Sequence, residues 1–225
     1  MTHDSLALAA RLYLLAWDAD RRRLTGTLYL DYLVRAGALT ELVQRGLLVD
    51  ADGAAKPVDD ARAGDAALDG LLELIGESRP RTWKTWVSHR RKFTLETVRT
   101  QLVDSGILRR RTGRRFGLFP SISYELEHPE LVREIREAAR SVMLGAEPAE
   151  EISDRDAALV ALAAAGELRT FASGKERRQY RARIEELTER SGATAPELKK
   201  VIKDVRAAMT VAITAASAGG AAAVG

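Results

Sequence analysis

The chain carries a segment in which positively charged side chains are strongly concentrated. Residues 79–115 contain twelve Lys or Arg and only two carboxylates, Glu96 and Asp104, which gives this segment a net charge of +10. The whole chain of 225 residues has a formal net charge of +3, so the remaining residues sum to about −7. Such a polarised distribution is typical of a protein that presents one face to an anionic partner. The sequence therefore predicts contact with either a phosphate-rich lipid surface or nucleic acid.

The first part of this segment alternates aromatic and cationic side chains: Trp83, Lys84, Trp86, His89, Arg90, Arg91, Lys92 and Phe93. On one helix, Trp83 and Trp86 would share a face with Arg90. Two interpretations stay open. Either both tryptophans belong to the core and the cations only face water, or the rings border a pocket whose arginines bind phosphate through bidentate, charge-assisted hydrogen bonds.

The second part predicts a β-hairpin over about residues 107–119, with a turn at Thr112 and Gly113. Five arginines precede three apolar residues there: Arg109, Arg110, Arg111, Arg114, Arg115, Phe116, Leu118 and Phe119. Strand alternation puts Phe116 and Leu118 on one face and Phe119 on the other, so at least one apolar side chain should be exposed unless a partner covers it. Cations beside exposed apolar side chains suit a lipid interface. The hairpin could instead mediate self-association, or form the wing of a winged-helix nucleic-acid-binding unit behind a helix over residues 95–105.

Residue types that would support catalysis or metal binding are scarce. The chain has no cysteine and only three dispersed histidines, and it contains no glycine-rich phosphate loop or nucleophile motif. Adjacent carboxylates such as Glu150 and Glu151 lie in highly charged helical contexts, which favours solvated faces over acid–base work. We therefore expect no enzymatic activity, no cofactor and no metal site.

The two ends of the chain predict neither a secretory signal nor a membrane span. Residues 1–9 lack the basic and apolar parts of a signal peptide. Residues 207–225 are uncharged, but small residues rather than strongly apolar ones dominate them. This favours a cytoplasmic protein that ends in a flexible Ala/Gly tail over residues 217–225. Only seven of the 35 basic residues are Lys and alanine is abundant, which is typical of a GC-rich bacterial genome.

Helical periodicity predicts an all-α fold, a single mostly helical domain over residues 1–216 with a protruding β-hairpin. After two apolar helical stretches near the start, helices are expected over residues 65–76, 81–91, 95–105, 129–144, 154–165, 175–190 and 196–216. Residues 42–48 and 102–108 match at a shift of 60 residues, as helix, glycine and strand. Gly46 and Gly106 should each end a helix in the left-handed conformation. We interpret the two segments as halves of one helical core, with chance recurrence of a common pattern as the alternative.

Several short stretches follow one another in a recognisable order: residues 35–42, 45–48, 85–87, 102–108, 116–120 and 128–129. In their order and spacing they resemble the Golgi phosphoprotein 3 family, over roughly residues 6–216. The resemblance implies a single, mostly helical domain with a protruding β-hairpin. Eukaryotic members are peripheral Golgi proteins that bind phosphatidylinositol 4-phosphate and retain glycosyltransferases by their cytosolic tails. Their hairpin mediates self-association and membrane contact.

The resemblance also implies site residues. Arg35 matches the family's pocket arginine in an Arg-x-x-x-Leu-x-Glu-Leu segment, and Lys92 is the nearest counterpart of a second group of pocket cations. Three neighbouring cations could substitute there: Arg90, Arg91 and Arg99. The family's pocket tryptophan has no match, because residues 25–27 are Thr-Gly-Thr. This departure puts specificity for the 4-phosphate in question and leaves a general anionic site intact.

Together these observations predict a non-enzymatic peripheral membrane protein that docks reversibly on anionic lipid at the inner face of the membrane. The predicted lipid is phosphatidylinositol 4-phosphate by resemblance, with a possible adaptor role and a possible homo-oligomer through the hairpin. A bacterial member would lack a Golgi, so the sorting role does not transfer. Each cation near an anionic membrane contributes about 1 kcal/mol, so about six suffice for reversible recruitment. The alternative is a winged-helix-like nucleic-acid-binding protein.

Overall fold

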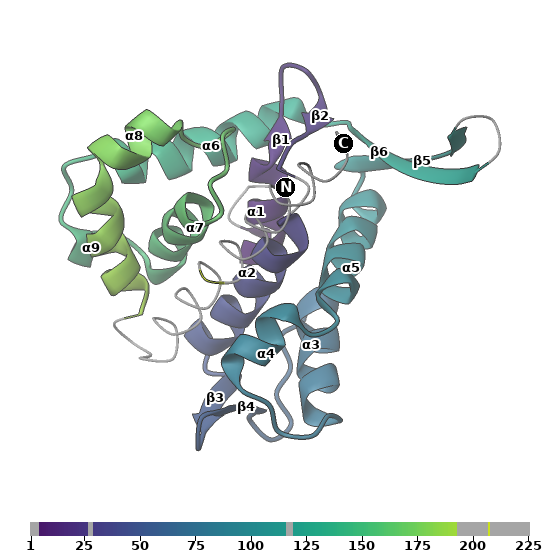
Figure 1. Cartoon of the computed structure of the whole chain (residues 1–225), viewed down its shortest axis with the longest axis vertical. Helices are drawn as coiled ribbons and strands as arrows, with labels where there is room; N and C mark the ends of the chain where they lie inside the picture. The colour runs from purple at the N-terminus through teal and green to yellow at the C-terminus, as the bar shows by residue number, and fades with distance from the viewer. Residues whose placement is uncertain (1–4, 27–28, 116–118, 193–206, 208–225) are drawn as a thin grey trace, which may run out of the picture.

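The computed structural model of the chain describes residues 5–26, 29–115, 119–192 and 207 (Figure 1). It confirms a mostly helical fold with small antiparallel hairpins, β1–β2, β3–β4 and β5–β6. The elements in chain order are α1 (Leu8–Leu15), β1 (Trp17–Asp18), β2 (Arg23–Leu24), α2 (Leu30–Gln44), β3 (Leu48–Ala51), β4 (Ala54–Pro57), α3 (Ala66–Gly76), α4 (Trp83–Ser88), α5 (Arg91–Asp104), β5 (Leu108–Arg115), β6 (Phe119–Leu126), α6 (Pro129–Leu144), a 3-10 turn (Ala149–Glu151), α7 (Asp154–Ala165), α8 (Gly174–Gln179) and α9 (Arg181–Ser191).

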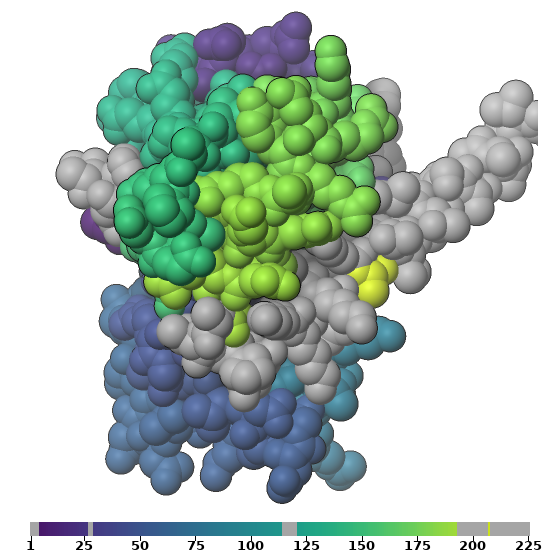
Figure 2. Space-filling model, turned by 90° about the vertical axis from the view of Figure 1, so that its left-hand side faces the viewer, coloured from purple at the N-terminus to yellow at the C-terminus, as the bar shows by residue number. Residues whose placement is uncertain are grey.

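Three helices, α1, α2 and α7, form the centre of the core. Every residue of α1 is buried, and so is almost all of α2 and the run Ala157 to Ala164 of α7. A helix that is apolar on all sides must be covered on all sides. Accordingly, α3, α4 and α5 pack around one flank of α2, and α6 and α9 pack against α7 on the other flank (Figure 1). In the side view of Figure 2, the α6–α9 flank lies above the part of the molecule that contains β3 and β4.

Helix starts agree well with their local sequence signals. Asp65 caps α3 by accepting hydrogen bonds from the backbone N–H groups of Ala67 and Leu68, both at 3.0 Å. Ser153 caps α7 through Asp156 N–H, at 3.1 Å, and Pro129 occupies the first turn of α6. The predicted helices over residues 65–76, 129–144 and 154–165 are therefore confirmed to within one residue.

The two related segments have the same backbone geometry. Gly46 and Gly106, which follow α2 and α5, have φ angles of +67° and +74°, so both predicted left-handed helix ends are confirmed. Each N–H donates to the carbonyl three residues back, at 2.9 Å, and each glycine leads into a strand. The first strand turns at Asp52 and Gly53, which both have positive φ as a two-residue hairpin turn requires.

Three of the predicted helices differ from the structure in their bounds. The expected helices over residues 81–91 and 95–105 are α4 and α5, and the break between them falls at His89 and Arg90. The expected helix over residues 175–190 is divided into α8 and α9 at Tyr180. The helix predicted over residues 196–216 and the tail over residues 217–225 fall outside the described residues, apart from residue 207. No helix within the described ranges is long and apolar enough to span a membrane.

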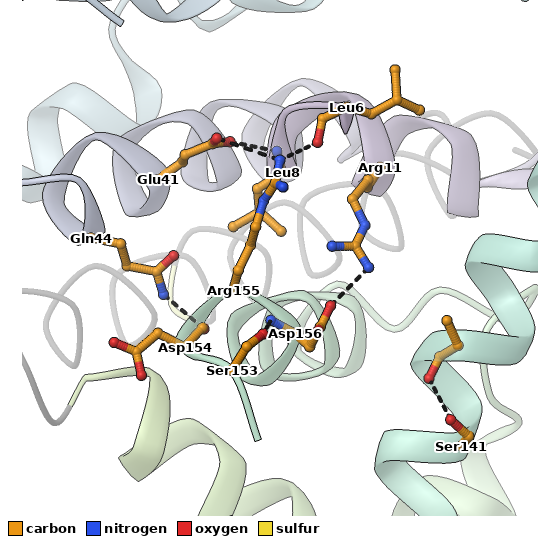
Figure 3. A network of polar contacts seen from close by, with 11 residues as sticks. Leu6, Leu8, Arg11, Glu41, Gln44, Ser141, Ser153, Asp154, Arg155 and Asp156 are labelled. Atoms are coloured by element: carbon orange, nitrogen blue, oxygen red, sulfur yellow. Dashed lines mark hydrogen bonds and ion pairs between the residues drawn. The ribbon is translucent and has the colours of Figure 1, made fainter. Parts of the chain in front are cut away.

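A buried polar network joins the three central helices (Figure 3). Glu41 of α2 accepts a hydrogen bond from the first N–H of α1, that of Leu8, at 2.5 Å, and its other oxygen lies 3.5 Å from Arg155 Nη2 of α7. Arg155 also donates to the carbonyl of Leu6. Arg11 of α1 pairs with Asp156 of α7 at 2.9 Å. Since Arg11 and Glu41, the buried charges of this network, each lie beside an opposite charge, we assign the network to stability.

Candidate anion-binding site

The β3–β4 hairpin positions the segment that begins the candidate site. The Ala55 N–H donates to the carbonyl of Arg81 at 3.2 Å, which adds the chain before α4 to the edge of β4. The Trp83 indole N–H donates to Asp50 of β3 at 2.5 Å, which fixes the first turn of α4. Trp83 and Trp86 are both fully buried, so both rings pack within the core.

The junction between α4 and α5 has an unusual backbone. Arg90 has φ +48° and ψ +30°, a left-handed conformation that is uncommon for a residue other than glycine. Its carbonyl accepts hydrogen bonds from two sources, Phe93 N–H at 2.9 Å and Arg35 Nη2 at 2.8 Å. Arg35 of α2 is thereby held against the start of α5. Strained conformations of this kind are often found at functional sites.

Several buried donors near this junction have no acceptor. Arg35 Nε and Nη1, Arg81 Nε and Trp86 Nε1 are buried and have no hydrogen-bond partner in the described part of the chain. Trp86 contacts the His89 ring, and Arg35 and Arg81 both act on this ring electrostatically. The rings of Trp86 and His89 meet edge to face with centroids 5.5 Å apart, and Arg81 lies 6.0 Å from the Trp86 ring. Buried donors are usually paired in folded proteins, so this cluster of unpaired donors makes the junction a candidate binding site.

The electrostatics also favour an anion. Arg35 is completely buried, and this burial lowers its pKa to about 10, so the guanidinium remains charged at neutral pH. The nearest acid on its own helix face, Asp31, is paired with Arg91 at 2.8 Å. Arg35 has no ion pair with any described carboxylate. A buried cation without a counter-ion is costly, and a bound anion would remove that cost.

The other predicted headgroup residues have different surroundings. Arg91 pairs with Asp31 and stacks over Tyr32 at 4.0 Å, so its charge is already compensated. Arg99 pairs with Glu96 at 2.6 Å and lies between the rings of Tyr13 and Tyr124, two turns along α5 from the junction. Arg90 and Lys92 are exposed and line a cavity of about 460 Å³ between α3 and α5. The structure thus brings Arg35, Arg90 and Lys92 to one end of α5.

The hairpin arginines lie at the opposite end of α5, about 20 Å away by the helical rise of 14 residues. The hairpin protrudes from the helical body (Figure 1). Its strands are longer than predicted, and the turn predicted at Thr112 and Gly113 is wrong. Both residues lie inside β5, opposite Ile122 and Ser121. Gly113 does not adopt positive φ, so its conformational freedom is not used for a turn.

Carboxylates in β6 and directly after it compensate part of the positive charge of this hairpin. Arg109 pairs with Glu127 and Arg111 with Glu125, each at 2.9 Å, whereas Arg110 is exposed without such a partner in the described residues. Ile122 is 53% exposed and supplies an apolar side chain on the same arm. The other residues predicted for a hairpin contact lie outside the part that the structure describes. They are Phe116 and Leu118, together with the side chains of Arg114, Arg115 and Phe119.

A comparison with models of known protein families shows which family the chain belongs to. A family model described as Golgi phosphoprotein 3 (GPP34) matches residues 8–205, nearly the whole chain. The chain belongs to the Golgi phosphoprotein 3 family. The family predicted from the order of short motifs is thereby confirmed, and the family consists generally of non-catalytic adaptors. A search of curated proteins finds no match. The bacterial origin stays a prediction.

Arg81 and His89 belong to the candidate site but have no distinct signal in the sequence. Arg81 was counted only as one of many cations, because its link to β4 is a tertiary contact without a local pattern. The sequence predicts Trp86 either in the core or at the border of a phosphate pocket, and it gives His89 no role of its own. The alternation of aromatic and basic residues in this stretch was the available signal.

Proposed function

We propose that this member of the Golgi phosphoprotein 3 family binds the phosphate of an anionic lipid headgroup at the cluster of Arg35, Arg81, Trp86, His89 and Arg90, here called the anion site. The observation that carries the proposal is the Arg35 guanidinium, buried and charged, with two N–H groups that lack an acceptor. By family, the lipid is phosphatidylinositol 4-phosphate, and the protein is a non-enzymatic adaptor that binds the cytoplasmic face of a membrane reversibly.

The donor chemistry supports phosphate as the ligand group. Within the described residues, the unpaired polar groups at the site are N–H donors and the charges that act on His89 are positive. Phosphate oxygens accept several charge-assisted hydrogen bonds at once, and guanidinium suits them geometrically. The site lacks the family's pocket tryptophan, so we do not extend the proposal to discrimination between phosphate positions on the inositol ring.

The rim of the site supports a membrane as the source of the ligand. Lys84, Arg90 and Lys92 are exposed, and Phe93 beside them is 47% exposed. Cations that meet lipid headgroups next to an aromatic side chain that reaches the acyl boundary are typical of peripheral membrane proteins. A free soluble phosphate compound would not require the exposed Phe93.

Liposome flotation tests this function. The protein should float with vesicles that contain phosphatidylinositol 4-phosphate and remain in solution with neutral phosphatidylcholine vesicles. Increasing salt should weaken the association because exposed charges are screened over about 8 Å at physiological ionic strength. Equal flotation with neutral vesicles would contradict the proposal. Tight binding to duplex DNA together with absence of lipid binding would favour the nucleic-acid alternative.

The protruding β5–β6 hairpin is proposed as a second contact, for the bilayer or for another copy of the chain. Arg110 and Tyr124 are register partners, so a two-residue Asn-Gly turn can replace residues 111–123 and close the shortened ladder. This design keeps Tyr124, which lies 5.1 Å from Arg99. The helical circular dichroism and melting temperature should not change, because a projecting arm contributes little to the core.

The shortened variant should show a lower mass in light scattering, weaker liposome binding, or both. If its mass and its lipid affinity equal those of the parent, the hairpin has neither role. If the variant fails to fold, the hairpin belongs to the core and the proposal is wrong.

A further inference from the structure

We propose that His89 couples the anion site to pH: binding of a phosphate or sulfate dianion is accompanied by uptake of a proton on the His89 imidazole, so that affinity increases as pH falls. The inference rests on the proposed function and adds to it a residue and a form of regulation. It concerns the phosphate group itself, whichever lipid carries it.

The position of His89 brings it into the middle of the donor cluster. It follows the last residue of α4, where its N–H donates to the Thr85 carbonyl at 2.7 Å, and its ring packs against the edge of the Trp86 indole. The side chain is half-buried, so it borders both the site and solvent. No hydrogen bond from its ring is present among the described residues, which leaves both ring nitrogens available.

Among the described residues, the charges that act on the imidazole are positive. Three cations act on it electrostatically: Arg81 from the segment beside β4, Arg90 from the α4–α5 junction and Arg35 from α2. Partial burial, followed by these three cations, lowers the pKa of His89 below its ordinary value of 6.5. Acids on the neighbouring elements do not offset this: Asp31 of α2 is paired with Arg91, and Glu73 and Glu77 of α3 share a cavity with Arg90 without acting on His89.

A bound dianion would reverse this balance. It adds negative charge and hydrogen-bond acceptors beside a ring whose charged form is otherwise disfavoured by partial burial and three cations, so the imidazolium becomes favoured. Linkage then requires that the protonated protein binds the anion more tightly than the neutral one. Each unit by which the anion raises the pKa of His89 corresponds to a tenfold difference in affinity between the two forms. Binding is therefore strongest below the pKa of the free protein and weakens as pH rises through the pKa of the complex.

Proton NMR of the histidine C2–H signals tests the proposal on the full chain. Sulfate is the probe, because it remains a dianion across neutral and mildly acidic pH, whereas a phosphate monoester has its own pKa of about 6. The His89 signal is assigned with the variant His89→Gln, and His128, which is exposed and paired with Glu130, is the internal control. Titrations are compared in sulfate and in chloride at equal ionic strength, and sulfate binding is followed independently at the Trp86 indole N–H.

We expect sulfate to raise the pKa of His89 by at least about one unit and to leave the His128 signal unaffected, and we expect several-fold tighter binding at acidic than at alkaline pH. The variant His89→Gln should bind sulfate with the same affinity at acidic and at alkaline pH. If sulfate shifts the Trp86 signal but not the pKa of His89, the pH coupling is wrong and the anion site stands. If sulfate affects neither residue while the fold is intact, both the coupling and the proposed site are wrong.

Discussion

Replacing Arg35 with methionine should reduce binding to vesicles that contain phosphatidylinositol 4-phosphate by ten- to a hundredfold, while the protein keeps or slightly increases its melting temperature. Arg35 is completely buried in α2, and among the described residues its Nη2 alone has a hydrogen-bond partner, the Arg90 carbonyl. A hydrogen bond to a charged group contributes about 1.5 to 3 kcal/mol, which corresponds to the expected loss of affinity.

The effect on stability should have the opposite sign. Burial lowers the pKa of Arg35 to about 10, so in the free protein this charge costs about 3 kcal/mol by the conversion of 1.36 kcal/mol per pKa unit. Methionine fills a similar unbranched volume without a charge, which removes this cost. The Arg90 carbonyl retains its bond to the Phe93 N–H. A residue that costs stability and is retained for binding is typical of functional sites.

Arg178→Met is the matched control, since Arg178 is exposed on α8 and its loss changes the net charge by the same amount. The control should bind vesicles nearly as well as the parent. If Arg35→Met unfolds the protein, the residue is structural. If Arg35→Met and Arg178→Met weaken binding equally, only total charge matters and the site assignment fails.

The variant Glu41→Ala should lower the free energy of unfolding by about 3 kcal/mol, the usual cost of breaking a buried ion pair. It removes the acceptor of the Leu8 N–H at the first turn of α1 and the carboxylate near Arg155. For a chain of this size about 3 kcal/mol corresponds to a melting temperature lower by roughly 6 to 12 °C. Differential scanning calorimetry measures the change directly.

The control for this prediction is Glu185→Ala, which breaks an exposed pair with Arg181 on α9. Exposed pairs contribute about 0 to 1 kcal/mol, so its melting temperature should be close to that of the parent. Equal melting temperatures for the two variants would show that the network in Figure 3 does not stabilise the core. Any folded Glu41→Ala protein should still bind lipid, because Glu41 lies outside the anion site.

Local chemistry made much of the fold predictable. Caps such as Asp65 and Ser153 act within one turn, and Gly46 and Gly106 are needed where a helix ends in positive φ, so short sequence windows contain these signals. The order of short motifs similarly revealed the family. The hairpin turn was placed wrongly because Thr-Gly usually marks a turn, whereas pairing with β6 stabilises Gly113 within a strand.

The site was predictable only in part because tertiary contacts create it. The break at Arg90 falls inside the helix predicted over residues 81–91, without a glycine or proline, and the conformation of Arg90 is fixed by hydrogen bonds with Arg35 and Phe93. The burial of Arg35 cannot be read from composition, since arginine usually lies at the surface. Likewise, Arg109 and Arg111 have no acidic neighbour in the local sequence. Their partners, Glu127 and Glu125, lie on the far side of the hairpin loop.

We propose that the buried donors of Arg35 and Trp86 donate hydrogen bonds to a bound phosphate. Nitrogen-15 NMR of the Trp indole N–H and Arg Nε–H signals, during addition of soluble short-chain phosphatidylinositol 4-phosphate, tests it most directly. The signals of Trp86 and Arg35 should shift in a saturable manner, while that of Trp83, already bonded to Asp50, should not. Saturable lipid binding that leaves Trp86 and Arg35 unchanged would contradict the account.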